Sequence, residues 1–203
     1  LNQLDDRPRR LINASGISFY GNSELLCDEN SPAGEGFLAD VCQQWEACLD
    51  ALKQPHTSVA MRIGVVLGAG GGALEEMIKP MRWGIAGRIS HGRQWMSWVS
   101  LRDLHGVIDF LADKCAITGA VNAVAPEPIQ NEPFMRCLAK IMRRPFFLHA
   151  PAWALRLRFG EMADELLLAS NRICPNTLQE HGFSFQDTDL ESCLRLILEK
   201  PHA

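Results

Sequence analysis

Apolar residues along the chain form two kinds of pattern, short continuous runs and longer stretches at helical spacing. Residues 10 to 15 (RLINAS) predict a short buried strand, and residues 58 to 67 (SVAMRIGVVL) predict a second one. Between them, residues 36 to 52 place their apolar side chains on one stripe of a helix, with most of the acidic and amide side chains off it. The order strand, helix, strand is the repeating unit of an α/β fold with a parallel sheet.

The rest of the chain continues this alternation. Its pattern predicts a loop at 22–35, helices at 73–82, 101–112 and 130–142, a loop with short strands at 84–99, and a strand at 118–124. Towards the end, Pro151 and Pro175 suit the first positions of helices, since proline lacks only an N–H that is unpaired there. Thr188 and Glu191 have capping-box spacing before a last helix at 189–199.

Composition narrows the class of protein. The 203 residues suffice for one large domain, or for one domain with a small appendage. A net charge of -4 without a dense Lys/Arg cluster argues against nucleic acid as the main partner. No apolar window approaches the roughly 20 residues of a membrane span, so no membrane partner is expected. The seven cysteines form no C-x-x-C pair, which fits reduced thiols and a cytoplasmic location.

Six short segments in a fixed order resemble one family of proteins. They are RLINASGISFYG, GFLADVCQQWEA, RIGVVLGAGGGAL, HGRQWMSWV, GAVNAVAPEP and RRPFFLHAP, in a resemblance that extends over about residues 10 to 198. Together they resemble the atypical sugar-nucleotide epimerases among the extended short-chain dehydrogenases/reductases, of the NAD-dependent epimerase/dehydratase type. The resemblance implies the latter two-thirds of such a protein, without the half that carries the glycine fingerprint. A first residue other than methionine, Leu1, is in keeping with a fragment.

The resemblance also implies a division of the chain. The expected fold is the C-terminal part of a Rossmann-like parallel sheet followed by a mainly helical substrate lobe. On this basis residues 1–68 belong to the nucleotide-binding domain, with 101–124 packing back on it. Residues 69–145 form the substrate lobe and returning elements, and 146–203 form a C-terminal helical segment of unknown function.

The glycine-rich segment Gly68 to Ala73 fits the pattern G-x-G-x-x-G/A that cradles a dinucleotide. A true fingerprint is followed about 20 positions later by an acidic residue that holds the ribose, and RISHGRQW stands there instead. We therefore expect these glycines to form a tight turn. A self-contained nucleotide site over residues 58–125 is the least favoured alternative.

Members of the wider family carry proton transfer on a Tyr-x-x-x-Lys helix. Aligned on Trp45 and Glu46, this helix has Leu38 at the Tyr position and Cys42 at the Lys position, so the usual relay is absent. Ser15 is expected at the carboxyl end of a strand, where such sheets bind ligands, and either touches cofactor or substrate or caps the turn.

The other candidates for chemistry carry two interpretations each. Tyr20, the only tyrosine, is either a general acid or a packed ring. Cys42 is a nucleophile only if a neighbour lowers its pKa, and otherwise a buried thiol. Glu46 is either a surface carboxylate or the partner of an arginine.

Further candidates concern binding. By resemblance, the strand that carries Arg62, Gly64 and Val66 passes near the nicotinamide of NAD or NADP, with NADP favoured. The loop at 91–98 offers Arg93, Gln94 and Trp98, an arginine for phosphate, an amide and an indole that suit a nucleotide sugar; the alternative is a loop packed by its tryptophans. The histidines have no metal-ligand spacing, so no metal is expected.

The sequence thus predicts an NAD(P)-dependent sugar-nucleotide epimerase or oxidoreductase, with Ser15 and Tyr20 as catalytic candidates. Its substrate would be a nucleotide-sugar-like small molecule, and this chain alone is not expected to hold the cofactor. The alternative is an NAD(P)-binding regulator or scaffold with little turnover. The sequence leaves the oligomeric state and the substrate open.

Overall fold

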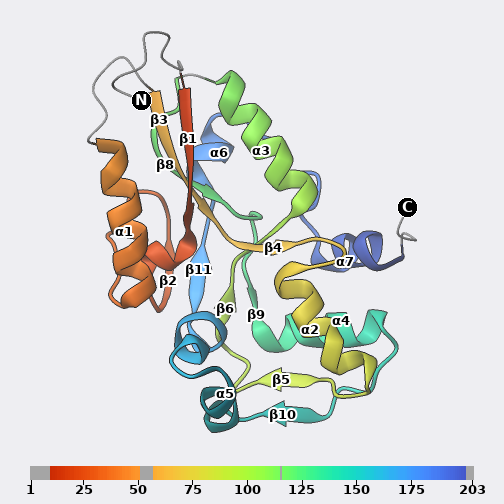
Figure 1. Cartoon of the computed structure of the whole chain (residues 1–203). Helices are drawn as coiled ribbons and strands as arrows, with labels where there is room; N and C mark the ends of the chain where they lie inside the picture. Colours follow the sequence, from red (N-terminus) through yellow and green to blue (C-terminus); the bar gives the residue numbers. More distant parts are fainter. Residues whose placement is uncertain (1–9, 51–56, 115, 200–203) are drawn as a thin grey trace.

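A three-stranded parallel sheet forms the centre of the protein, whose computed structural model describes residues 10–50, 57–114 and 116–199. Its strands are β1 (Arg10–Gly16), β3 (Thr57–Ile63) and β8 (Gly119–Ala123), in the order β1-β3-β8. The predicted α/β fold with a parallel sheet is confirmed. Two helices cover this sheet, α1 (Phe37–Asp50) on one side and α3 (Leu101–Asp113) on the other (Figure 1).

The two faces of the sheet differ in chemistry because strand residues alternate in direction. Val59 and Met61 of β3 join Leu111 of α3 in an apolar cluster. The opposite face carries Ala60 and Arg62 and lies under α1. The α3 face is therefore core, and the α1 face has room for polar groups.

Further strands form four two-stranded sheets. The parallel pairs are β4 (Val65–Leu67) with β7 (Trp98–Ser100), β5 (Gly87–Ile89) with β10 (Leu148–Ala150), and β2 (Ser23–Cys27) with β11 (Asn171–Ile173); β6 (Trp95–Met96) and β9 (Ile129–Gln130) are antiparallel. The remaining elements are η1 (Ile17–Tyr20), α2 (Gly72–Arg82), α4 (Asn131–Ile141), α5 (Ala152–Phe159), η2 (Ala163–Leu168), α6 (Asn176–Glu180) and α7 (Leu190–Glu199). A second core joins α2, α4, α7, β4 and β7. Among the described residues, none of the helices has the length and apolar character needed to span a bilayer.

Two segments differ from the pattern-based prediction. The run at 58–67, predicted as one strand, breaks at Gly64 into β3 and β4. A Cβ at Gly64 would lie 2.7 Å from the backbone oxygen of Ser97, so only glycine allows this approach. Residues 22–35, predicted as a loop, contain strand β2, which pairs with the distant β11.

In the last quarter of the chain, the observed first residues of the helices also differ slightly from the predicted ones. Pro151 and Pro175 are the cap residues of α5 and α6 and precede the first helical positions. The backbone N–H of Ser192 donates to the carboxylate of Asp189 at 2.8 Å, so Asp189 caps α7 in place of the predicted Thr188.

The glycine-rich segment that follows β4 is an exposed turn leading into α2. Gly70 and Gly72 have φ values of 79° and 66°, and a Cβ at either position would meet nothing within 4 Å. Backbone conformation therefore accounts for these two glycines, as expected for a tight turn.

Candidate functional site

A polar network lies at the carboxyl ends of the central strands, built around the buried side chain of Arg62. Register places Ser15 of β1 and Asn122 of β8 on either side of Arg62 of β3. The Arg62 Nε and a terminal guanidinium nitrogen donate to the two carboxylate oxygens of Glu46 at 2.9 and 2.7 Å. This bidentate pair is 5% and 14% exposed at its two side chains, so it is held largely away from water.

The other terminal guanidinium nitrogen of Arg62 contacts Tyr20. That nitrogen donates to the Tyr20 hydroxyl at 2.8 Å, and the hydroxyl donates to the side-chain oxygen of Asn122 at 2.8 Å. Burial raises the pKa of Tyr20 to about 12, since the loss of phenolate hydration outweighs the nearby guanidinium. At neutral pH Tyr20 is therefore a protonated phenol whose hydrogen is already engaged. Its predicted role as a general acid stays a prediction.

Ser15 joins the same network through Glu46. Its Oγ donates to a Glu46 carboxylate oxygen at 2.7 Å, and the residue is 6% exposed. The single hydroxyl proton is thus engaged, and the oxygen lone pairs remain as acceptors. Contact of Ser15 with cofactor or substrate stays a prediction.

Three members of the network were not identified as functional from the sequence. For Glu46 the sequence allows either a surface carboxylate or the partner of an arginine, and the structure shows the pair with Arg62. Phe19 stacks under Arg62, with the guanidinium carbon 3.4 Å from the ring centroid. Asn122 is fully buried and also donates to the backbone oxygen of Cys174 at 3.0 Å. A lone amide within the apolar run Ala-Val-Asn-Ala-Val was the available signal for Asn122.

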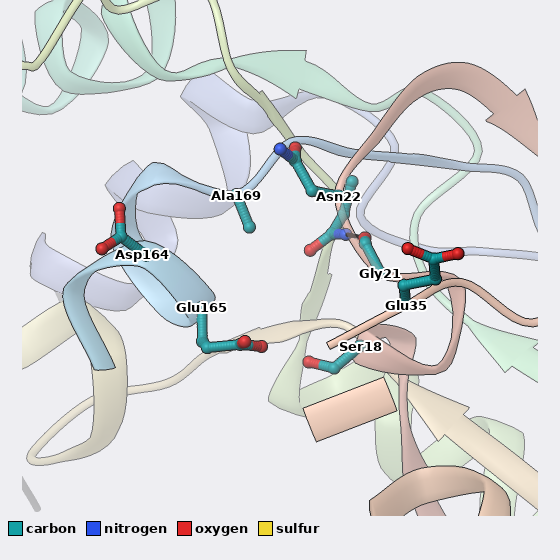
Figure 2. A pocket seen from close by; sticks show the side chains of 8 residues that line it. Ser18, Gly21, Asn22, Glu35, Asp164, Glu165 and Ala169 are labelled. Carbon is teal, nitrogen blue, oxygen red and sulfur yellow. Dashed lines mark hydrogen bonds between the residues drawn. The ribbon is translucent and has the colours of Figure 1, made fainter. Parts of the chain in front are cut away.

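A cavity of about 170 Å³ lies between the segment that follows β1 and the segment that precedes β11 (Figure 2). Its lining is polar and acidic: Ser18, Gly21, Asn22, Glu35, Asp164, Glu165, Ala169 and Asn171. The two walls are joined by hydrogen bonds. The Ser170 N–H donates to the Asn22 side chain at 2.8 Å, and the Asn171 amide donates to the Gly21 backbone oxygen at 2.6 Å. These hydrogen bonds therefore hold the two walls of the cavity in a fixed relative position.

A second hollow, of about 330 Å³, borders the ion pair on the α1 side of the sheet. The hollow is present because several sheet residues beside it have small side chains. It is lined by Phe19, Gln43, Glu46, Ala47, Leu49, Ser58, Ala60, Arg62, Gly119 and Ala120. It borders the Arg62–Glu46 pair on that side, although the two side chains are only 5% and 14% exposed.

The residues predicted to bind substrate lie in different environments. Arg93 is exposed. Gln94 is 1% exposed and donates its amide to the backbone oxygens of Ile89 and Leu167, while Trp98 is 1% exposed within the second core. Among the described residues, none of the three forms a hydrogen bond with the Arg62 network. Their binding of substrate stays a prediction.

The predicted cofactor contacts are Ser15, Arg62, Gly64 and Val66. Glu46 forms hydrogen bonds with both Ser15 and Arg62. Gly64 lies at the break between β3 and β4, where its N–H donates to the backbone oxygen of Ala123 at 3.2 Å, and Val66 lies in β4. Within the described residues, no group of three or more His, Cys, Asp or Glu side chains is arranged to hold a metal ion.

Comparison with known proteins finds similar proteins over most of the chain. Residues 150–197 match a family described as a domain of unknown function (DUF1731). An epimerase family protein of Mycobacterium bovis is 37% identical over 193 residues, which are 94% of this chain and 64% of that protein. Over nearly its whole length the chain matches the epimerase family of extended short-chain dehydrogenases/reductases.

Two solved structures extend the comparison. The crystal structure of the human epimerase family protein SDR39U1 (isoform 2) with NADPH has a TM-score of 0.92 and 27% identity, and covers 98% of this chain and 68% of that one. A nucleoside-diphosphate sugar epimerase of Corynebacterium glutamicum has a TM-score of 0.72 and 27% identity, and covers 94% of this chain and 37% of that one. The chain thus spans somewhat less than two thirds of the mycobacterial relative's length.

Proposed function

We propose that this chain is part of an NAD(P)-dependent oxidoreductase or epimerase that acts on a nucleotide-sugar-like substrate. The observation that carries this proposal is the similarity, over nearly the whole chain, to the human family member whose structure contains NADPH. The substrate class follows from the similarity to the nucleoside-diphosphate sugar epimerase of Corynebacterium glutamicum.

The residues present fit one end of a dinucleotide. Open α/β sheets bind ligands at the carboxyl ends of their strands, where Ser15 and Arg62 lie. In this proposal Ser15, Arg62, Gly64 and Val66 lie near the nicotinamide, with NADP the favoured cofactor. A bound nicotinamide would supply hydride transfer. The exposed turn at 68–73 is not expected to hold the phosphates.

The chain's own residues restrict how a proton moves. The Tyr20 hydroxyl donates to Asn122, so it could protonate a substrate only after that hydrogen bond breaks. Ser15 offers lone pairs to a substrate hydroxyl or cofactor amide, while its own proton is held by Glu46. We therefore propose Ser15 as a catalytic residue that orients the reacting groups, and Tyr20 as an acid only in a rearranged network.

A second candidate function is cofactor binding without turnover, as a regulator or scaffold. It is favoured by Leu38 and Cys42 at the Tyr and Lys positions and by the high pKa of Tyr20. Such a protein would bind NADPH and leave every nucleotide sugar unchanged.

The test is titration of the intact protein that contains this chain with NADPH and NADH, followed by turnover assays with nucleotide sugars. We expect NADPH binding that Ser15→Ala weakens several-fold, with exposed Ser184→Ala as the matched control. Arg93→Ala is expected to reduce turnover without unfolding the protein, since Arg93 is exposed. Binding of neither cofactor would refute both candidate functions, and binding without turnover would favour the regulator.

A further inference from the structure

The segment of unknown function supplies half of the acidic cavity. Asp164, Glu165, Ala169 and Asn171 all lie within the matched residues 150–197. Figure 2 shows the Glu165 side chain extending from this segment towards Ser18 on the opposite wall. The cavity therefore exists only where the C-terminal segment meets the end of the central sheet.

The Glu165 carboxylate lies close to Gly36, the residue after Glu35 of the opposite wall. Gly36 has a φ of 122°, and a Cβ there would lie 3.1 Å from a carboxylate oxygen of Glu165. A side chain at this position would require the carboxylate to shift slightly. The Glu165 carboxylate therefore lies between η2 and the loop before α1.

The charge of the cavity is negative. Asp164 is neutralised by Arg156, whose Nε and terminal nitrogen lie 3.0 and 2.8 Å from its carboxylate. Glu35 and Glu165 form no salt bridge with any side chain that the structure describes, and the lining contains no Lys, Arg or His. Such a wall accepts hydrogen bonds and repels anions.

The size of the cavity limits what it can hold. Its volume of about 170 Å³ is below the roughly 300 Å³ at which sites for drug-sized ligands begin. A nucleoside diphosphate is too large and carries the wrong charge. A sugar ring or one of its substituents has suitable dimensions, and its hydroxyl or ammonium groups are donors.

We propose that Glu165 is a specificity-determining residue, which accepts a hydrogen bond from a hydroxyl or ammonium group of the sugar and disfavours a carboxylate there. This inference rests on the proposed function, because it assumes a nucleotide-sugar substrate. It gives the C-terminal segment a role in selecting the sugar.

The test compares UDP-glucose with UDP-glucuronic acid, which differ at one carbon by a hydroxymethyl or a carboxylate group. Binding to the intact protein with NADPH is measured by calorimetry. We expect UDP-glucose to bind at least about tenfold more tightly, a difference of about 1.4 kcal/mol. Glu165→Gln should reduce this ratio to about threefold or less, because the like-charge repulsion is removed.

Two further variants control the experiment. Glu161→Gln removes the same charge at an exposed position four residues earlier, outside the lining, and it should leave the ratio unchanged. If Glu165→Gln fails to fold, Glu35→Gln in the opposite wall should lower the ratio in the same direction. UDP-glucosamine separates the two donors, since tighter binding than UDP-glucose indicates an ammonium partner and equal binding indicates a hydroxyl.

The outcomes are distinguishable. Equal binding of UDP-glucose and UDP-glucuronic acid, or a ratio that is the same in the wild type and both lining variants, would overturn the role of Glu165 alone. Binding of none of these probes, in a protein that still binds NADPH, would refute the nucleotide-sugar substrate and this inference with it.

Discussion

The ion pair between Arg62 and Glu46 offers a sharp test of how the site is held together. Glu46→Gln removes the negative charge with little change of shape and leaves the guanidinium buried without a counter-ion. Arg62 is only 4% exposed, so water from the adjoining hollow replaces the lost partner only in part. Breaking a buried pair from one side costs about 3–5 kcal/mol. Because Glu46 keeps 14% exposure and Phe19 still stacks on Arg62, we expect a loss near the lower end, about 3 kcal/mol.

The assay is urea unfolding of the intact protein, wild type and variants, followed by tryptophan fluorescence. Glu76→Gln is the matched control, because Glu76 pairs with Lys79 at a site where both side chains are more than half exposed. That substitution should change stability by no more than about 0.5 kcal/mol. The double variant Glu46→Gln/Arg62→Met should lose at least about 1 kcal/mol less than the sum of its two single variants. If Glu46→Gln shifts the midpoint no more than Glu76→Gln does, the buried pair does not support this site and the reasoning fails.

Three further predictions test other parts of the structure. The pKa of Tyr20 is raised to about 12 from an ordinary 10.0. The neutral phenol therefore contributes its full stability below pH 10, and this contribution is lost as the pH rises towards 12. Tyr20→Phe should abolish this alkaline loss of stability in pH-dependent unfolding, and an unchanged slope of stability against pH would contradict the prediction. Gly64→Ala should destabilise by about 1–3 kcal/mol, since its Cβ would meet a backbone oxygen 2.7 Å away. Gly71→Ala, in open space at the N-cap of α2, should cost less in the same urea series, no more than about 1 kcal/mol. The backbone amide of Gln186 donates to the buried carboxylate of Asp103 at 2.9 Å. Asp103→Asn should lower the free energy of unfolding by about 1–3 kcal/mol and speed hydrogen exchange at the Gln186 amide. Unchanged exchange would show that this contact is dispensable.

Most of the central elements could be predicted because their patterns are local. Strands β1 and β8 and helices α1 to α4 agree with the periodicity to within about two residues at their ends within the described range. Strand β2 could not be found in this way. It exists because it pairs with β11 about 150 residues later, and its Leu25 and Leu26 are exposed, so no alternation marks a buried face.

The break at Gly64 has a similar cause. The apolar run at 58–67 is continuous in sequence, but its first part pairs with β8 and its second part with β7. A change of pairing partner leaves no mark in hydrophobicity. Only the glycine itself pointed to a close approach of backbones.

The candidate site shows the same limit of sequence patterns. The strand end at Ser15 could be placed, since ligands of α/β sheets gather there. The sequence could not show that Glu46 is the partner of Arg62, because the two residues are 16 positions apart and meet only when α1 packs against β3. The acidic cavity was beyond sequence patterns altogether, because its two walls are more than 120 residues apart.

The structure also shows how α1 packs at the positions where the family resemblance places a Tyr-Lys pair. Cys42, at the lysine position, is buried and lies 3.6 Å from the point where a Cβ of Gly16 would be, so this turn of α1 packs against the strand end without a charge. Four residues later, on the same face of the helix, Glu46 binds the cation that β3 supplies. Burial raises the pKa of Tyr20 to about 12, and the guanidinium of Arg62, which is paired with Glu46, lowers that pKa only in part. Proton transfer from Tyr20 would first require Arg62 or Asn122 to release its hydroxyl, and any turnover by this protein should therefore depend on a rearrangement that the Tyr-Lys arrangement does not need.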